Sequence, residues 1–371
     1  MAIPRPNQFA YPPPSSPTLG PVTPVELSRT VLSAVRRAVD VGELDVSLPE
    51  RVVVTPPRPG GCGDYATNVA LQLARPAGRP APVVAQVLRG HLLGLDGIGD
   101  VTVTEPGFLN ISLRDADAEA ALVRLVEDVR RAGERYAYAP GAAEAVVELR
   151  CPREVRALVV ADVVKRLLHS QGSEARVVPV GPIPARWEQI LGVHAEPVGD
   201  DTVPAVHVRP VPAPADPLPL GRDAGRWALL HPAGRDRPRV GDEHLVQRES
   251  NPLFRVRYAH ARVRALGRSA ADLGFGAQAG PLDVVPSELV ALLADHPRVL
   301  ARAADHHAPD VLARHLVSVA DAVLPFLATV LPRGDEKPSA AHRARLALAE
   351  AAGTVLAGGL SLLGIDAPEH L

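Results

Sequence analysis

The chain has 371 residues, of which 46% are hydrophobic, and its formal net charge is −2. Such a chain is expected to fold into two or three domains with hydrophobic cores rather than to stay disordered. The small net charge argues against a general polyanion binder, so any nucleic-acid contact must come from a local patch. No long uncharged apolar run and no secretory signal are recognisable, which predicts a cytoplasmic protein without a membrane span.

The first 142 residues are predicted to be a flexible tail, residues 1–20, followed by a small α+β domain, residues 21–142. The tail is rich in proline and polar residues. The domain alternates helical periodicity with short β-branched runs. Its expected elements are a helix from Pro24, a strand over 51–57, helices over 63–75, 81–93 and 115–133, and two short strands around the Pro106–Gly107 turn.

Residues 143–222 contain one expected βαβ unit with parallel strands, formed by a strand over 145–150, a helix over 155–172 and a strand over 175–180. Prolines crowd the stretch from Gly181 to Leu220, where extended or irregular structure is expected. Residues 143–222 are therefore predicted to be a short α/β segment between two other domains.

Residues 223–371 are expected to be almost entirely helical and to form an antiparallel bundle. Long apolar-periodic stretches run over 286–304, 308–331 and 340–364. The Pro286-Ser287-Glu288 pattern predicts a helix start, and Gly364 predicts a helix end.

The strongest local signal is the helix predicted over 250–270 (SNPLFRVRYAHARVRALGRSA), with Asn251 as its cap and Pro252 in its first turn. At helical spacing Arg257, Arg264 and Arg268 share one side. Phe254, Tyr258, Ala261 and Ala265 share another. A basic stripe beside an aromatic face can hold phosphates and stack a base. The alternative is a solvated arginine face over an aromatic core contact.

The segment NPLFRVRYAHARVRAL resembles the Asn-Pro…Tyr-Ala-His-Ala-Arg signature of the anticodon-binding domain of arginyl-tRNA synthetases. Residues 223–232 (DAGRWALLHP) resemble the Asp-Ala-Leu-Arg stretch that names this domain, with Gly225 in place of leucine. The end of the chain is similar to the closing helix of the family, but it ends His370-Leu371 where the family usually ends in methionine. The resemblance implies an all-α DALR domain over 223–371. Its implied contacts to the anticodon arm are Arg255, Arg257, Tyr258, His260, Arg262 and Arg264.

The first domain resembles the N-terminal extra domain of the same family. GDYATNVALQLAR (63–75) is similar to its Gly-Asp-Tyr-Ala-Thr-Asn segment, and PGFLNISL (106–113) to its Pro-Gly-Phe-Ile-Asn-Phe strand. In the family this domain leans on the tRNA elbow. The resemblance therefore implies that Tyr65, Asn68, Phe108 and Asn110 contact the elbow. In the alternative, Asp64 and Asn68 cap a helix and Phe108 belongs to the core.

The middle of the chain departs from the family, which activates its amino acid through a His-x-Gly-His turn and a lysine-bearing loop. No two histidines here are three residues apart, and no lysine lies between Lys165 and Lys337. Both signatures act electrostatically on the transferring phosphates. The segment therefore looks like a Rossmann-like remnant of the catalytic domain, and the sequence predicts a chain that is not an enzyme and has no catalytic residue.

No metal site and no cofactor are predicted. His296, His306, His307 and His315 cluster in sequence without the i, i+4 pairing of a helical zinc site. Two distant cysteines, Cys62 and Cys151, give neither a disulfide framework nor a zinc knuckle.

The favoured hypothesis is an accessory or regulatory tRNA-binding protein, with the arginine acceptor as its tRNA and with neither DNA nor a membrane as a partner. Such a protein would present tRNA to a tRNA-modifying enzyme or sense its charging state. A second hypothesis is a protein-interaction module that docks on the true arginyl-tRNA synthetase or on another partner. A third is an arginine–tRNA ligase completed by a partner chain.

Overall fold

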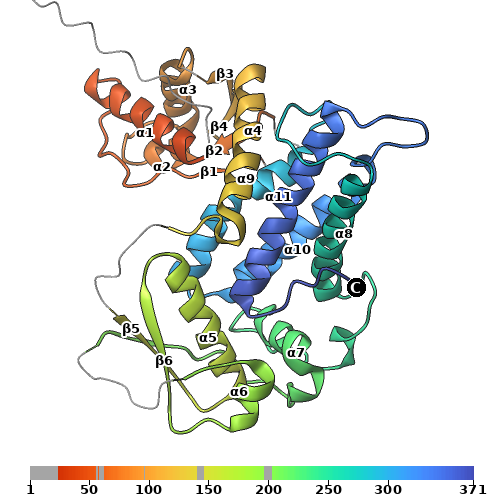
Figure 1. Cartoon of the computed structure of the whole chain (residues 1–371). Helices are drawn as coiled ribbons and strands as arrows, with labels where there is room; N and C mark the ends of the chain where they lie inside the picture. Colours follow the sequence, from red (N-terminus) through yellow and green to blue (C-terminus); the bar gives the residue numbers. More distant parts are fainter. Residues whose placement is uncertain (1–23, 56, 58–61, 96, 140–145, 196–202) are drawn as a thin grey trace, which may run out of the picture. The chain divides into compact units, whose positions relative to one another are not determined.

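The structure is a computed structural model that describes residues 24–55, 57, 62–95, 97–139, 146–195 and 203–371. The predicted tail, residues 1–20, lies outside these ranges. The contacts divide the chain into two compact units, Met1–Ala118 and Glu119–Leu371. The chain is a mixed α/β protein with a helical C-terminal region, as predicted (Figure 1). The finer division at residues 142 and 222 stays a prediction.

The first unit is built on a four-stranded antiparallel sheet in the order β1-β2-β4-β3. Leu109 and Ile111 of β4 lie on the face that packs against the helices, in one core with Leu27 and Leu88. This burial of alternate strand residues is what half-buried strands require. The elements of the unit are α1 Pro24–Asp40, β1 Val54–Thr55, β2 Tyr65–Thr67, α2 Val69–Ala74, α3 Ala81–Leu92, β3 Ile98–Thr104 and β4 Phe108–Leu113.

The segment predicted as a helix over 63–75 begins instead as strand β2. Tyr65 and Thr67, which favour strands, pair with Ile111 and Leu109 of β4. Asp64 does not cap a helix, because its Oδ2 accepts the Leu113 N–H at 2.8 Å. The helix prediction was therefore wrong up to Asn68, because pairing with a distant strand overrides local periodicity.

The second unit contains a small parallel sheet in the order β6-β5-β7, so the predicted βαβ unit is confirmed. The stretch from Gly181 to Leu220, predicted to be irregular, contains a helix and a strand. The prolines of this stretch lie before or after the helix and the strand and never inside them. The steric conflict of proline with the interior of such elements therefore does not arise. The elements are β5 Val146–Cys151, α5 Val155–Ser170, β6 Glu174–Pro179, α6 Ala185–Leu191 and β7 Ala205–His207.

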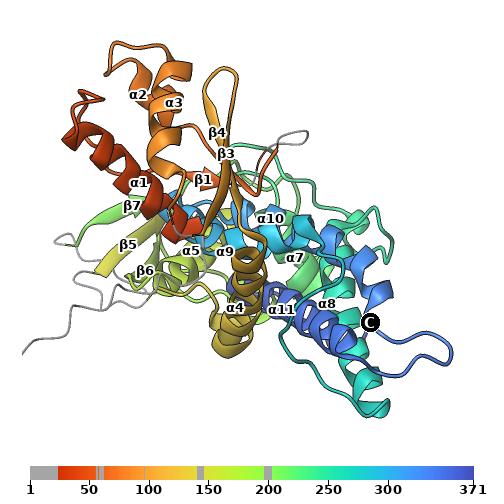
Figure 2. The same cartoon turned by 90° about the horizontal axis from the view of Figure 1, so that it is seen from above.

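The helical part of this unit has α8, α10 and α11 packed against one another (Figures 1 and 2). The approach of α11 to α8 depends on Gly353, where an added Cβ would lie 2.8 Å from Val263 Cγ1. The helices are α4 Asp115–Ala132, which starts in the first unit, α7 Gly221–Leu230, α8 Pro252–Asp272, α9 Ser287–Asp305, α10 Pro309–Phe326 and α11 Ala340–Leu363. Short 3-10 turns occupy Gly133–Arg135, Leu218–Leu220, Asp242–His244 and Leu327–Thr329.

The helix boundaries predicted at Asn251, at Pro286-Ser287-Glu288 and at Gly364 are confirmed. The Asn251 side chain accepts the Leu253 N–H at 3.1 Å at the start of α8. Gly364, with φ of 71°, closes α11 in the left-handed conformation that glycine adopts without strain. The Pro286-Ser287-Glu288 pattern also marks a helix start, since α9 begins at Ser287 with Pro286 at its cap.

Among the described residues, two helical stretches, Pro309–Thr329 and Ala340–Leu363, meet the length and composition criteria for a membrane span. The second is 83% buried inside the protein, as a core helix is. Length and composition therefore do not distinguish these core helices from membrane spans, and the absence of a span stays a prediction.

Two buried arginines hold the start of the helical region in place. Arg226 of α7 is fully buried, and its Nη2 donates to Asp162 Oδ2 of α5 at 2.5 Å. Its Nε donates to the Leu363 carbonyl at 2.7 Å. Arg156 of α5 donates to five backbone carbonyls, those of Val211, Leu229, Pro232, Ala233 and Asp236. These bonds fix the loop that leads into α8.

Candidate nucleic-acid interface

One face of α8 carries a stacked aromatic pair between two arginines. The rings of Phe254 and Tyr258 lie 5.4 Å apart between centroids, at an angle of 19°. Tyr258 is 37% exposed although it is a large ring. Arg255 and Arg262 lie within one turn of Tyr258 on this side of the helix. The arrangement offers a ring for stacking and guanidinium groups for phosphates.

The two arginines on this face differ in their partners. Arg255 pairs with Asp321 of α10 at 2.9 Å. Arg262 is exposed, and its guanidinium group has no hydrogen-bond or ion-pair partner among the residues that the structure describes. Arg262 is therefore the cation of this face that is most available to a ligand.

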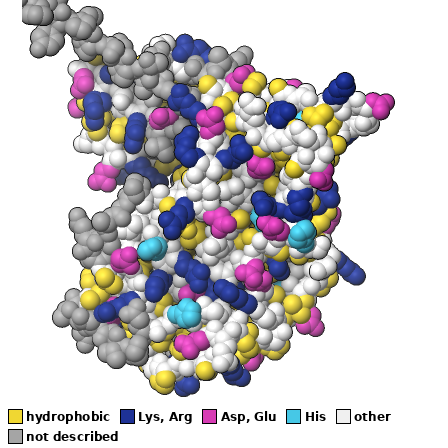
Figure 3. Space-filling view, viewed as in Figure 1, with side chains coloured by type: hydrophobic (Ala, Val, Ile, Leu, Met, Phe, Trp, Pro, Cys, Tyr) yellow, Lys and Arg dark blue, Asp and Glu magenta, His cyan; other side chains and the backbone are white. Residues whose placement is uncertain are grey.

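A second face of α8 carries the predicted stripe of Arg257, Arg264 and Arg268, and here each guanidinium contacts the chain itself. Arg257 pairs with Asp223 at 3.3 Å, and Arg264 pairs with Glu369 at 2.7 Å. Arg268 donates to the Glu369 carbonyl at 3.3 Å. On the face drawn in Figure 3, acidic side chains are likewise interspersed among the basic ones.

His260 lies inside the protein rather than on either exposed face. It is 6% exposed, and its Nδ1 lies 2.9 Å from the Pro368 carbonyl oxygen. A carbonyl only accepts, so Nδ1 carries the proton. Burial lowers the pKa of His260. Its predicted contact with tRNA stays a prediction, and its burial favours a role in holding the C-terminal segment.

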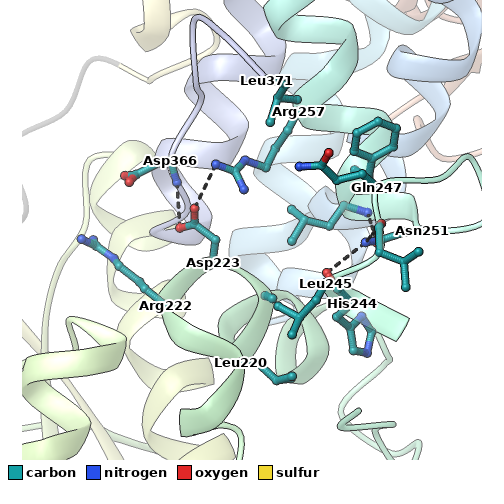
Figure 4. Close-up of a pocket in the computed structure, with 14 residues that line it drawn as sticks. Leu220, Arg222, Asp223, His244, Leu245, Gln247, Asn251, Arg257, Asp366 and Leu371 are labelled. Atoms are coloured by element: carbon teal, nitrogen blue, oxygen red, sulfur yellow. Dashed lines mark hydrogen bonds and ion pairs between the residues drawn. The ribbon is translucent and has the colours of Figure 1, made fainter. Parts of the chain in front are cut away.

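Beside the start of α8 lies a pocket of about 320 Å³. Arg257 and Asp223 point toward one another across it, and Leu371 lies at its rim (Figure 4). Asn251 holds the adjoining loop by donating to the carbonyls of His244 and Val246, each at 2.9 Å. The sequence reasoning missed this pocket because its walls come from α7, the loop before α8 and the C-terminus.

The four residues predicted to contact the tRNA elbow do not share one face of the first unit. Tyr65 pairs with Ile111 in the sheet and lies on its core side. Phe108 and Asn110 alternate with the core residues of β4 and lie on the opposite side, where Asn110 donates to Thr104 Oγ1 at 2.8 Å. Asn68 is exposed after β2 and accepts a hydrogen bond from Gln72 at 3.1 Å. Phe108 and Asn110 thus share one face of the sheet, and Phe108 is the more accessible of the two because Asn110 is only 4% exposed.

The carboxyl ends of the parallel strands form a third candidate region, where α/β sheets commonly bind ligands. A shallow pocket of about 320 Å³ lies there, lined by Arg153, Glu154, Arg186 and Trp187 among others. The Glu154 side chain accepts the Ala157 N–H at 2.8 Å and the Ala213 N–H at 3.2 Å. The Glu154 carboxylate thus provides a hydrogen-bond acceptor for a free N–H group in the first turn of α5, at the position where an anionic ligand would otherwise bind.

The clustered histidines separate in the structure. His296 and His315 stack in the core with ring centroids 5.2 Å apart, and His296 also stacks on Tyr136 at 5.9 Å. His306 and His307 lie in the turn after α9. Within the described ranges no three His, Cys, Asp or Glu side chains gather in a way that could hold a metal ion.

Comparison with known proteins identifies both ends of the chain. Residues 26–113 match the family described as "Arginyl tRNA synthetase N terminal domain", and residues 256–371 match "DALR anticodon binding domain". A protein named "Arginine--tRNA ligase" from Frankia alni is 26% identical over an alignment of 563 residues, which covers 94% of this chain and 100% of the relative. Because the alignment is much longer than the chain, many of its positions have no counterpart here.

Solved structures show the same fold. The arginyl-tRNA synthetase of Thermus thermophilus has a TM-score of 0.66 at 14% identity, with 94% of this chain and 100% of that chain covered. The enzyme of Plasmodium falciparum has a TM-score of 0.69 at 10% identity, with 96% and 100% covered.

These comparisons correct one prediction from the sequence. A chain that is not an enzyme was expected, but the similar proteins are named as ligases or synthetases, and this contradicts the prediction. The missing signatures were too narrow a basis for it, because they describe two motifs and not the whole chain. The two matched domains and the relatives together show that the chain is related to the arginyl-tRNA synthetases.

Proposed function

We propose that the chain binds tRNA, with the arginine acceptor as its preferred partner, and serves arginine–tRNA ligation as an accessory or regulatory factor. The observation that carries the proposal is the exposed Tyr258 ring, which is stacked on Phe254 between Arg255 and Arg262. Tyr258 and Arg262 lie inside the segment 256–371 that matches the DALR anticodon binding domain, and the other two residues come directly before it. Unpaired loop bases stack on such rings, and phosphates bind the flanking guanidinium groups.

In this proposal α8 faces the anticodon arm. In the first unit, the sheet face that carries Phe108 and Asn110 meets the tRNA elbow. The layout of the chain as an N-terminal domain, a truncated Rossmann-like segment and a DALR domain belongs to the same proposal, as does its cytoplasmic location.

The experiment is retention of total tRNA by the purified full chain at two salt concentrations, followed by sequencing of the bound RNA. Enrichment of arginine acceptors that is lost at high salt supports the proposal, because phosphate contacts weaken steeply with salt. Arg262→Ala should lower retention. Arg302→Ala removes an equal charge from the exposed surface of α9 and should not. Absence of retention at low salt contradicts the proposal.

A second candidate is ligation itself, by this chain alone or with a partner chain, and the name of the Frankia alni relative favours it. The test is arginine-dependent exchange of pyrophosphate into ATP by the purified chain, with tRNA present. Exchange above the blank establishes ligase chemistry. Without exchange, the same assay repeated with the synthetase of the source organism asks whether the chain alters the activity of that enzyme.

A further inference from the structure

The C-terminal segment Asp366–Leu371 follows Gly364 and lies on the second face of α8. His260 contacts the Pro368 carbonyl, Arg264 pairs with the Glu369 carboxylate, and Arg268 donates to the Glu369 carbonyl. The Nη2 of Arg268 also lies 3.3 Å from His370 Nδ1. The segment therefore contacts two of the three arginines of the stripe, Arg264 and Arg268, with its own oxygen atoms.

These contacts differ in how firmly they are held. The contact of His260 with the Pro368 carbonyl is largely shielded from water, which anchors the backbone of the segment. The pair of Arg264 and Glu369 is half exposed on both sides. Arg264 lowers the pKa of the Glu369 carboxyl through a hydrogen bond and its charge, so the carboxylate stays ionised at neutral pH. An exposed pair of this kind adds little stability and is easily exchanged.

We propose that the Glu369 carboxylate occupies a phosphate position on Arg264, and that a backbone phosphate of bound RNA displaces it. The inference rests on the proposed binding of tRNA. Carboxylate and phosphate present similar oxygen pairs to a guanidinium group. RNA gains the further advantage of counterion release, which a single carboxylate lacks. In this proposal the segment Asp366–Leu371 competes with weak anions for this face and is displaced by a polyanion such as RNA.

The test is the affinity of the full chain for unfractionated tRNA at about 50 mM salt, with Glu369→Gln beside the unchanged chain. Removing the competing charge should tighten binding about two- to fivefold, the effect expected for one exposed pair. The gain in affinity from Glu369→Gln should vanish when it is measured in a chain that already carries Arg264→Ala, because the competition needs the Arg264 guanidinium group.

Asp272→Asn is the matched control, since it removes one exposed negative charge from the last residue of α8, two turns beyond Arg264. It should tighten binding less than Glu369→Gln does. An equal gain in affinity in the control, or no gain in Glu369→Gln, overturns the proposed displacement of Glu369 by RNA but leaves the proposed tRNA binding unaffected. If neither the unchanged chain nor Glu369→Gln binds tRNA, the proposed function and the proposed displacement of Glu369 both fail. Equal melting temperatures verify that the variants are folded.

Discussion

Phe254 and Tyr258 stack one helical turn apart at the start of α8, with ring centroids 5.4 Å apart. Phe254 is half-buried, and its ring packs against one face of the exposed Tyr258 ring, which limits the motion of Tyr258. A ring held in this way loses little conformational freedom when a base stacks on it. The pair thus presents a supported aromatic ring on the proposed RNA-binding face of α8.

Tyr258→Ala should weaken tRNA binding by about 1–3 kcal/mol, the usual contribution of one stacked base. Tyr258→Phe keeps the ring and should retain most of the affinity. Filter binding measures both. A large fall in the melting temperature of Tyr258→Ala would instead assign the ring to the core.

Arg226→Ala should destabilise the second unit by about 3–5 kcal/mol, because it leaves the buried Asp162 carboxylate without its closest partner. The free energy of unfolding in urea measures the effect. Arg222→Ala is the control on the same helix, since Arg222 is exposed and, among the described residues, its side chain donates to the Gly364 carbonyl alone. Equal losses in the two variants would show that burial of the Arg226–Asp162 pair is not the cause.

Acid should destabilise the protein through two core histidines. Burial lowers the pKa of His296 to about 3 and that of His315 to about 4, from 6.5 in the unfolded chain. Between the folded and unfolded pKa values the unfolded chain binds more protons than the folded chain does. The stability that comes from keeping the two histidines neutral is therefore fully present above pH 6.5 and is lost as the pH falls toward 4. Each histidine should account for a loss on the order of 2 kcal/mol by pH 4.5.

His315→Leu should flatten this pH dependence, measured as melting temperature from pH 7.5 to 4.5. The exposed His169→Gln should leave it unchanged. An identical acid profile in His315→Leu and the unchanged chain would exclude this histidine as a cause.

Gly353→Ala should destabilise the helical region by about 1–3 kcal/mol, because the added methyl group meets Val263 of α8. Thermal unfolding measures the loss. Val263→Ala in the same chain makes room and should restore part of it, whereas no restoration would place the strain elsewhere.

The sequence predicts local features of the interface well and distant ones poorly. Asn251 and Gly364 act through neighbouring backbone groups, so a short pattern is sufficient to predict both. The partner of Arg264 lies 105 residues along the chain, and no local pattern reveals it. Helical spacing grouped the arginines correctly, but it could not show which were already paired.

The same limit applies to the first unit. The register of β2 on β4 puts Tyr65 on the core side, whereas the alternation along β4 puts Phe108 on the other. A one-residue change in pairing would reverse such an assignment, so it cannot be derived from motifs alone. The burial of His260 is similar, since it depends on the return of the chain at Pro368.

The most direct test of the central claim is the affinity of the full chain for arginine tRNA, compared with the same tRNA carrying a replaced anticodon loop. Fluorescence titration at about 50 mM salt gives both dissociation constants. Binding of the intact tRNA that weakens at least tenfold on loop replacement, with the difference abolished by Tyr258→Ala, is the predicted result. Equal affinity for the two RNAs, or no binding to either, would contradict the claim that α8 reads the anticodon arm.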